Sequence, residues 1–362
     1  MSIRVKLAKA GAALLLAAAA FIALCWLSYR HEMAIDPRRG IEESGYVTLG
    51  GLPQYIQIRG RDRRNPVLLL LNGGPGFTML PETYTFREWE KDYTLVMWDQ
   101  RGEGNTYYHS GAQAQGAMSI DRLARDGTEL ADYLRRHLGK DKIVVLGHSW
   151  GTMLGVHMVH LRPGLFHVYV GAGQLVDQQR GVAASLPPLL ERAHRLGNER
   201  AETELRAAGP PPYSADLRQW ISFLIWAQEL DPPAAEQPPN GPAAWWNRAN
   251  LYVARLFGPP ELAPTITPAV QFSMNSLWPD IVTDDVAKLG RFEVPVVMVQ
   301  GTEDLSTATS VAKKYYDGLE APSKIYVPLE GRGHLAFYRE PKTFLKILNR
   351  YVRPLAMEPP KS

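Results

Sequence analysis

The chain has 362 residues, of which 45% are hydrophobic and 21% are charged, so it can build the core of one large domain with an insertion or of two ordinary domains. This composition excludes a disordered chain. The formal net charge is +3 at pH 7, but residues 1–40 hold six Arg and Lys against Glu32 and Asp36, which leaves about −1 for the rest. Charge therefore excludes a basic nucleic-acid-binding body, and no nucleic-acid partner is expected.

The first predicted element is an apolar segment, Ala10–Tyr29, which has 20 residues and no charge. A helix rises about 1.5 Å per residue, so this segment would cross a bilayer core of about 30 Å. We interpret residues 1–40 as a membrane anchor followed by a linker, with the membrane as a partner. A cleaved signal peptide is one alternative, although its apolar region usually has about 7–15 residues and Leu27–Tyr29 makes a poor cleavage site. A buried helix is the other.

The charges around this segment bear on its orientation. Three basic residues precede it and three follow it: Arg4, Lys6, Lys9, Arg30, Arg38 and Arg39. This balance favours, by a small margin, a cytoplasmic N-terminus and a body on the extracytoplasmic side, with secretion after cleavage as the alternative. Cys25 is the one cysteine and lies inside the segment, so it cannot form an intramolecular disulfide.

Beyond the linker the sequence alternates between predicted strands and helices. The predicted strands cover 45–49, 54–60, 66–71, 93–98, 142–147, 166–173, 295–301 and 324–330. The predicted helices cover 119–139, the segment after 151, 308–319 and 342–352. Ser119 and Gly139 are expected to cap the first of these helices. Because several strands are continuous apolar runs, the pattern predicts an α/β fold with a mostly parallel sheet covered on both faces.

Residues 174–290 interrupt this alternation. They are rich in Pro, Ala and Trp and contain amphipathic pieces such as DLRQWISFLIWAQEL, residues 216–230. We interpret them as a mostly helical cap inserted between two parts of one core, residues 41–173 and 291–362. A separate C-terminal domain is the alternative, but the strands after residue 290 need a sheet to join.

The stretch VVLGHSWGTMLG, Val144–Gly155, places Ser149 between Gly147 and Gly151 at the end of an apolar strand. A strand that turns abruptly into a helix strains the residue at the bend, and small residues on both sides let the two segments approach closely. The Ser149 hydroxyl would then lie above the N-terminus of the following helix, where negative charge is stabilised. This context predicts that Ser149 is a nucleophile.

A serine nucleophile needs a histidine base that a carboxylate orients. His334 lies in EGRGHLAF, a glycine-flanked loop just after the last predicted strand, and is the candidate base. Asp304 follows the strand 295–301 and is the candidate acid, with Glu303 as the alternative. The other histidines lack such a position and are interpreted as structural: His31, His109, His137, His148, His157, His160, His167 and His194.

The oxyanion formed by such an attack needs two backbone donors. The N–H of Trp150, directly after the nucleophile, is the first. The second should come from the NGGPG turn that ends the strand 66–71, where Gly74 is the first choice and Gly73 the second. A plain tight turn is the alternative interpretation of NGGPG, but its position directly after a buried strand favours the donor role.

Three motifs in this order, NGGPG (72–76), WDQRGEGNT (98–106) and GHSWG (147–151), resemble the prolyl iminopeptidase branch of the α/β-hydrolases. The resemblance covers 45–175 and about 290–352 and implies an α/β-hydrolase fold with a helical cap. The chain order of Ser149, Asp304 and His334 is the family's order, and Trp150 and Gly74 match its oxyanion donors. Asp99, Gln100 and Arg101 match a loop to which we assign mainly structural pairing near the site. Asn72 replaces the family's histidine and Thr106 its final serine.

The resemblance implies a serine hydrolase that releases N-terminal residues, often proline, from short peptides through an acyl-enzyme, with no metal or cofactor. Cap carboxylates bind the substrate ammonium in this family, and the weak candidates here are Glu199, Glu202, Glu204 and Glu229, none of which lies in a motif. An aromatic set could line an apolar pocket or pack the cap: Trp220, Trp226, Trp245, Trp246 and Tyr252.

Two other functions stay open. A carboxylesterase or other small-molecule acyl hydrolase would use the same core, because the cap chooses the substrate. A non-catalytic, membrane-anchored binding protein is the third hypothesis, because a fold does not dictate an activity. Dehalogenase and epoxide hydrolase chemistry is disfavoured, since those relatives carry an aspartate at the position of Ser149.

Overall fold

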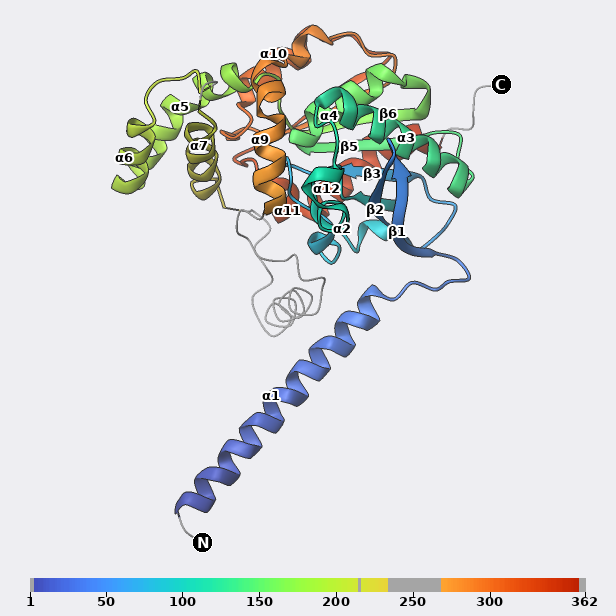
Figure 1. The fold of residues 1–362 in the computed structure, drawn as a ribbon, viewed down its shortest axis with the longest axis vertical. Coiled ribbons are helices and arrows are strands. Elements are labelled where there is room, and N and C mark those ends of the chain that lie inside the picture. Colours follow the sequence, from blue (N-terminus) through green and yellow to red (C-terminus); the bar gives the residue numbers. More distant parts are fainter. Residues whose placement is uncertain (1–2, 214–215, 234–267, 358–362) are drawn as a thin grey trace.

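The computed structural model describes residues 3–213, 216–233 and 268–357. Within them an eight-stranded sheet forms the centre of the molecule, in the order β1-β2-β4-β3-β5-β6-β7-β8 (Figure 1). The strands are β1 (Ile41–Leu49), β2 (Leu52–Gly60), β3 (Val67–Leu71), β4 (Thr94–Trp98), β5 (Ile143–Ser149), β6 (Phe166–Gln174), β7 (Val296–Gly301) and β8 (Lys324–Leu329). β2 is antiparallel to β1 and β4, and the remaining neighbours are parallel, which confirms the predicted mostly parallel sheet.

The helices of the core are α2 (Gly104–Ala114), α3 (Ile120–Leu138), α4 (Trp150–Leu161), α10 (Thr309–Gly318), α11 (Ala336–Arg339), α12 (Pro341–Ile347) and α13 (Arg353–Met357), with a π-helical turn η5 (Leu348–Val352) before the last. They include the four predicted from the sequence, at α3, α4, α10 and α12, and three that were not predicted, α2, α11 and α13. Two short 3₁₀ turns, η1 (Leu80–Glu82) and η2 (Trp89–Lys91), precede β4. α3 begins at Ser119, whose side chain accepts a hydrogen bond from the N–H of Arg122, and ends at Gly139, which is left-handed with φ 62°. Both caps were predicted from the sequence.

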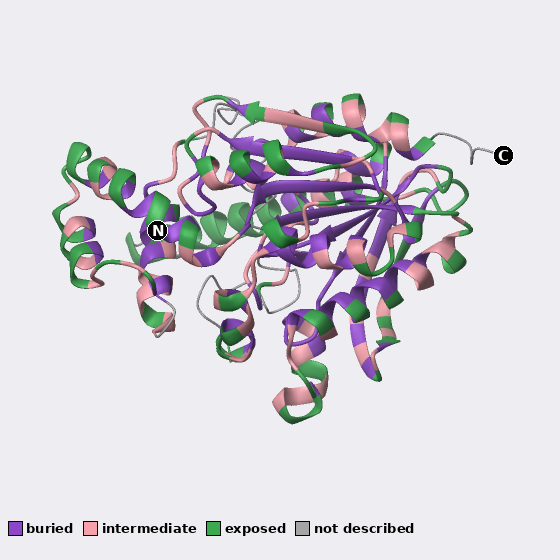
Figure 2. Cartoon of the chain, turned by 90° about the horizontal axis from the view of Figure 1, so that it is seen from above, coloured by how far each residue is buried: buried purple, intermediate pink, exposed green. Residues whose placement is uncertain are grey.

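Both faces of the inner strands are buried, as the purple strands in Figure 2 show, whereas the edge strands β1 and β8 are partly exposed. Along β3 the side chains alternate, so that Leu68 and Leu70 face one hydrophobic cluster and Leu69 faces the other. The cluster around Leu69 includes α3, α4 and α10, whereas the other includes η1, η2 and α11 to α13. The carboxyl ends of the parallel strands therefore meet at one edge, between two layers of helices.

Helices also fill the described part of the stretch between β6 and β7. They are α5 (Gln178–Arg195), α6 (Glu199–Ala207), α7 (Leu217–Glu229) and α9 (Pro268–Thr283), followed by the 3₁₀ turn η4 (Val286–Lys288) before β7. Another 3₁₀ turn, η3 (Pro163–Leu165), precedes β6. In Figure 1, α5, α6 and α7 lie beside the core, and α9 lies between them and the sheet. Trp245, Trp246 and Tyr252 lie outside the described residues. The domain boundaries at 40, 173 and 290 stay predictions.

The N-terminal segment forms one long helix, α1 (Ile3–Met33), which points away from the body (Figure 1). It has a mean hydropathy of 2.3 over its most apolar window, of which 6% is buried, so it is long and apolar enough to cross a membrane. A signal sequence near an N-terminus can also be long and apolar enough to meet this criterion, so cleavage stays the alternative. The helix is longer than the predicted apolar segment because it continues through the basic residues on both sides.

Candidate active site

Ser149 lies at the sharp bend between β5 and α4. Its backbone has φ 55° and ψ −122°, and it is the one non-glycine residue with a positive φ in the described part of the chain. Such a conformation costs on the order of 1–3 kcal/mol and persists only where the surrounding structure imposes it. The strain predicted from the sequence at this position is therefore present.

The two glycines beside Ser149 allow three backbone segments to cross closely. A Cβ on Gly147 would lie 2.2 Å from the carbonyl oxygen of Gly151, and one on Gly151 would lie 2.2 Å from that of Leu71. Neither contact tolerates a side chain. The GHSWG spacing is thus a requirement of packing α4 against the ends of β5 and β3, and this packing presents Ser149 at the sheet edge.

Asp304 and His334 meet at the same edge of the sheet. His334 Nδ1 lies 2.9 Å from Asp304 Oδ2, and both side chains are buried. The Asp304 carboxylate also accepts hydrogen bonds from the N–H groups of Ser306 and Thr307, the Thr307 hydroxyl and the Gln300 amide. These donors fix the carboxylate in one orientation, so it can hold the imidazole ring in turn.

The electrostatics of this pair suit a base and its orienting acid. Burial would raise the pKa of Asp304, but the charge and hydrogen bond of His334 and the Thr307 donors hold that pKa below its ordinary value. Burial would likewise lower the pKa of His334, yet the charge and hydrogen bond of Asp304 raise it above its ordinary value. Asp304 thus stays ionised and stabilises the imidazolium form of His334.

His148, the residue before Ser149, connects the base to the end of β5. Its ring centroid lies 4.7 Å from that of His334, and its Nε2 lies 3.2 Å from the His334 carbonyl oxygen. Burial lowers the pKa of His148 to about 3, so the ring is neutral and does not repel a protonated His334. Among the described residues no hydrogen bond joins the Ser149 hydroxyl to His334, and His148 is the neighbour of Ser149 whose ring contacts His334.

The predicted oxyanion residues lie against Ser149. Trp150 begins α4, and a Cβ on Gly73 would lie 3.2 Å from the Cβ of Ser149, so the glycine-rich turn borders Ser149. Gly74, the next residue, has φ 137°, a conformation that L side chains rarely adopt. The turn therefore needs glycine both for close approach and for its backbone conformation.

Glu103 supports this turn and was not singled out from the sequence. Its fully buried carboxyl group accepts hydrogen bonds from the N–H groups of Gly76 and Gln100 and from the Asn72 amide. Burial, followed by the charge of Asp99, raises its pKa well above the ordinary value, which favours the protonated form. Asn72, the departure from the family's histidine, is thus a partner of Glu103.

The other residues of the WDQRGEGNT motif make structural contacts. Arg101 pairs with Asp126 of α3 at 2.8 Å, and both side chains are buried. Asp99 accepts hydrogen bonds from the N–H and amide of Asn105, and burial raises its pKa to about 6. The Thr106 hydroxyl donates to the Asp99 carbonyl at 2.6 Å. These contacts agree with the structural role expected for the loop.

A carboxylate from the inserted stretch reaches the base. Asp231, just after α7, accepts hydrogen bonds from the N–H groups of His334 at 2.6 Å and Leu335 at 3.1 Å, and it pairs with Arg339 at 3.1 Å. Its side chain is only 1% exposed. Sequence reasoning missed Asp231, because DPP has no motif and the contact spans 103 residues.

The remaining candidates do not contact this site. Glu303 pairs with Arg192 of α5, so Asp304 alone of the two carboxylates holds His334. The four glutamates proposed for the substrate ammonium lie on α6 and at the end of α7: Glu199, Glu202, Glu204 and Glu229. Glu204 pairs with Arg200 and accepts a hydrogen bond from the Trp226 indole. Trp226 and Trp220 pack in the same hydrophobic cluster as Leu69 of the sheet, as the packing alternative expected.

Known proteins resemble the chain over most of its length. It is 28% identical over 333 residues to the probable aminopeptidase YbaC of Bacillus subtilis, covering 88% of this chain and 99% of that protein. It is 26% identical over 324 residues to the proline iminopeptidase of Lactobacillus delbrueckii subsp. lactis, covering 85% and 97%. A crystal structure titled as a membrane phospholipase A, a bacterial virulence factor, matches with a TM-score of 0.58 and 17% identity over 98% of both chains.

The family model named "Alpha/beta hydrolase family" matches residues 68–347. This range runs from β3 to the end of α12 and so includes the bend at Ser149, the loop of Asp304 and the loop of His334. The expected prolyl iminopeptidase-like branch agrees with the named relatives. The chain belongs to the α/β-hydrolase family and is a hydrolase.

Proposed function

We propose that the chain is a serine aminopeptidase of the prolyl iminopeptidase type, held at a membrane by α1, which releases N-terminal residues from short peptides through an acyl-enzyme. The observation that carries this proposal is the strained Ser149 at the sheet edge where the buried pair of His334 and Asp304 meets. The similarity to proteins named aminopeptidase and proline iminopeptidase supports the choice of substrate.

The reaction follows from the positions of these groups. His334 takes the proton of the Ser149 hydroxyl as its oxygen attacks the carbonyl carbon of the first residue. The N–H groups of Trp150 and Gly74 stabilise the oxyanion, and His334 then protonates the leaving amine as the carbon–nitrogen bond breaks. Water repeats the sequence on the ester and frees the amino acid. Asp304 stays ionised throughout and orients His334.

Hydrolysis of prolyl and other aminoacyl arylamides by the full chain in detergent tests this proposal. Ser149→Ala should lower kcat by about 10⁴-fold or more, because serine is the attacking group. Ser323→Ala, at an exposed serine just before β8, should leave kcat unchanged. A fluorophosphonate should label wild type and not the Ser149 variant. Equal hydrolysis by wild type and Ser149→Ala would contradict the assignment.

The second candidate is a carboxylesterase or other acyl hydrolase on the same core. The membrane phospholipase A structure favours it, because that likeness extends over 98% of this chain and so includes α1. Free and N-acetylated prolyl arylamides, measured beside short-chain esters, separate the two functions. An aminopeptidase should hydrolyse the free prolyl arylamide faster than the N-acetylated one. An esterase should hydrolyse the short-chain esters, and acetylation of the amine should not change its rate.

The location of the enzyme is part of the same proposal. α1 would act as an uncleaved anchor with the body on the extracytoplasmic side, and secretion after cleavage is the alternative. Flotation of the full chain with lipid vesicles and the mass of the mature protein separate the two.

A further inference from the structure

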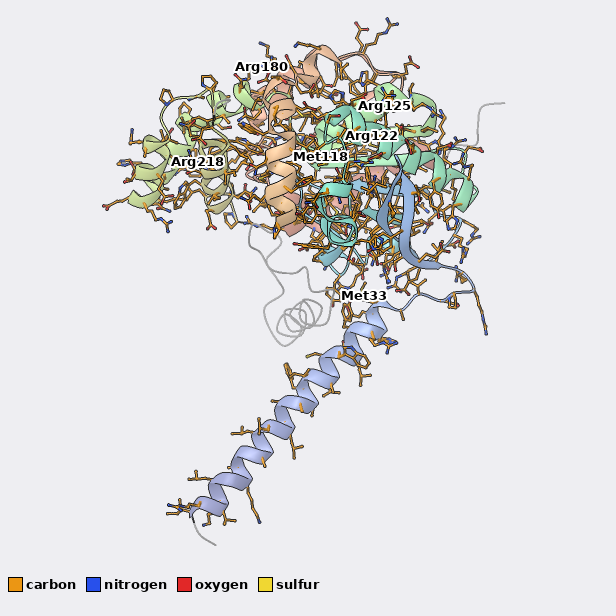
Figure 3. The ribbon with its side chains drawn as sticks, viewed as in Figure 1. Met33, Met118, Arg122, Arg125, Arg180 and Arg218 are labelled. Carbon is orange, nitrogen blue, oxygen red and sulfur yellow. The ribbon has the colours of Figure 1, made fainter. Side chains whose placement is uncertain are left out.

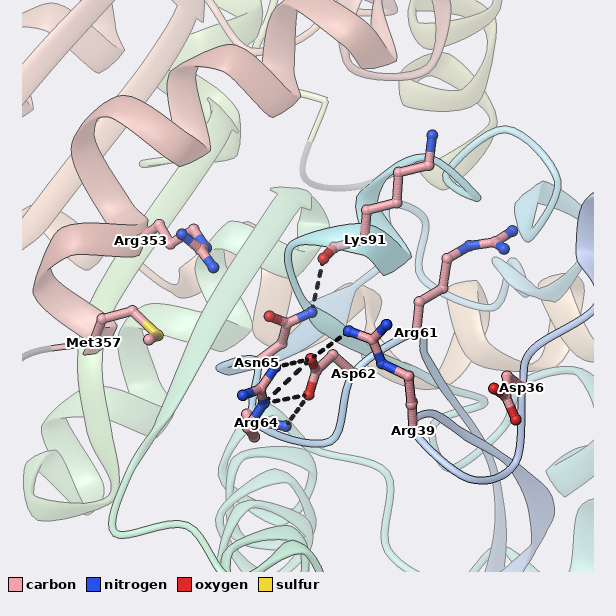
Figure 4. A pocket seen from close by; sticks show the side chains of 9 residues that line it. All are labelled: Asp36, Arg39, Arg61, Asp62, Arg64, Asn65, Lys91, Arg353 and Met357. Carbon is pink, nitrogen blue, oxygen red and sulfur yellow. Dashed lines mark hydrogen bonds and ion pairs between the residues drawn. The ribbon is translucent and has the colours of Figure 1, made fainter.

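A basic hollow of about 640 Å³ lies beside the end of α1, away from the candidate active site (Figure 4). Five cationic and two carboxylate side chains line it, together with Asn65 and Met357: Arg39, Arg61, Arg64, Lys91, Arg353, Asp36 and Asp62. Arg64 precedes β3 and Lys91 precedes β4, so the hollow lies at the amino ends of the parallel strands. Ser149, in contrast, lies at their carboxyl ends.

Hydrogen bonds fix the hollow to the end of α1. Arg61, which lines the hollow, donates to the carbonyl oxygen of Glu32 at 2.6 Å and to that of Ala34 at 3.3 Å. The Glu32 carboxylate accepts from the Tyr84 hydroxyl at 2.6 Å and from Arg87 at 3.0 Å. These bonds therefore fix the position of the basic hollow relative to the end of α1, which is labelled at Met33 in Figure 3.

The composition of α1 places this end at the level of the lipid headgroups. The uncharged stretch ends at Tyr29, and Arg30 follows with its guanidinium over the Trp26 ring at 4.9 Å. Trp, Tyr and Arg are enriched where a membrane-spanning helix meets water. Glu32 lies two residues further, about 3 Å along the helix axis, so an α1 that spans a bilayer would bring Arg61 close to the lipid phosphates.

The cations of the hollow are accessible and exceed its carboxylates. The side chains of Arg39, Arg64 and Lys91 are 70%, 84% and 57% exposed. Hydrogen bonds from Arg64 hold the pKa of Asp62 far below its ordinary value. Five positive against two negative formal charges line the hollow, and Lys91 and Arg61 also pair with Glu88 and Glu90 beside it. Exposed ion pairs are weak, and an arriving phosphate can share their guanidinium groups.

We propose that this hollow binds the phosphate of an anionic lipid headgroup and thereby holds the body against the bilayer surface. The inference rests on the anchor in the proposed function, and not on the identity of the substrate. Attraction between juxtamembrane Lys and Arg and anionic lipids falls off within a Debye length, so it acts only on a body that α1 keeps at the interface.

Hydrogen exchange of the full chain in nanodiscs tests this proposal. One set of discs holds phosphatidylcholine alone, and in the other about a third of the lipid is phosphatidylglycerol. Backbone exchange over 61–65 and 34–40 should slow by about threefold or more in the anionic discs, and salt at about 1 M should remove the difference. The double variant R39Q/R353Q should lose the protection. The control R200Q/R218Q removes two exposed arginines that pair locally on the cap, and it should keep the protection.

Four results would overturn the proposal. Equal exchange in the two lipids, or protection that survives R39Q/R353Q, contradicts a headgroup site. The same protection from inorganic phosphate in phosphatidylcholine discs assigns a soluble phosphate ligand instead. Failure of the full chain to float with vesicles contradicts the anchor and this inference with it. Arylamide hydrolysis is measured in the same samples. If only the proposed substrate is wrong, hydrolysis is absent while the protection in anionic discs remains.

Discussion

Charged side chains are buried and hydrogen-bonded at the sheet edge of the core, whereas those on helix α6 of the inserted stretch are more exposed. At the sheet edge, the carboxyl groups of Asp304 and Glu103 are buried and held by several donors each. On α6, Arg200 and Glu204 form a pair with side chains 78% and 41% exposed. Buried, multiply bonded groups have one geometry, whereas exposed pairs contribute little and tolerate change. The comparison indicates that the core fixes the reaction while the inserted stretch is free to adapt to the substrate.

The largest effect is expected at Asp304. Asp304→Asn should lower kcat by about 10⁴-fold, because the amide favours the wrong tautomer of His334 and cannot stabilise its protonated form. Because Asp304 raises the pKa of His334, the wild-type rate should fall with decreasing pH through a value above 6.5. In Asp304→Asn the residual rate should also fall as the pH decreases, but at a lower pH than in wild type. Glu303→Gln is the matched control and should keep the wild-type profile.

Substitutions at Asp231 test whether the inserted stretch influences the site in the core, because Asp231 follows α7 and contacts His334. Asp231→Ala leaves the N–H groups of His334 and Leu335 without their acceptor and should lower kcat by about 10- to 100-fold through displacement of the base. Asp231→Asn keeps the shape but removes a charge that raises the pKa of His334, so its acidic limb should shift to lower pH.

Asp216→Asn, which changes a carboxylate at the start of α7, provides the control for Asp231. An unchanged pH profile in both Asp231 variants would show that Asp231 acts only on the stability of the cap. The free energy of unfolding should be measured for each variant, because loss of a buried acceptor costs about 1–3 kcal/mol.

The sequence predicted more of the core than of the inserted stretch. The strands, the caps of α3 and the bend at Ser149 were predictable because each depends on local signals: apolar runs, a serine or glycine at a helix end, and paired glycines. Asp231 and Glu103 were not, because their roles arise from contacts with residues far away in the chain. Trp220 and Trp226 show the same limit, since composition could not distinguish a pocket from packing.

Substitutions of Glu103, which also lies in the core, should have smaller effects on kcat than those of Asp304 and Asp231. Glu103→Gln keeps one oxygen acceptor but places an NH2 group where the second carboxyl oxygen accepts a backbone N–H, so it should lower kcat and stability by less than loss of the whole side chain does. Glu103→Ala removes the acceptor for Gly76 and Gln100, so it should lower stability by about 1–3 kcal/mol and reduce kcat by disturbing the oxyanion turn. Thermal unfolding and arylamide hydrolysis measure both. Equal losses in the two variants would indicate that Glu103 is ionised in the fold.

The smallest effect is expected at Glu204, one of the glutamates first considered for the substrate ammonium. Its carboxylate is already engaged by Arg200 and the Trp226 indole, and neither residue belongs to the sheet edge that holds His334. Glu204→Gln should therefore change KM for a prolyl arylamide by less than about twofold, because an exposed pair contributes little. A tenfold rise in KM for the arylamide, with no change for an uncharged ester, would instead assign Glu204 to ammonium binding. That outcome would require α6 to approach the sheet edge during turnover, and it would make the inserted stretch a moving part of the site instead of an adaptable cover.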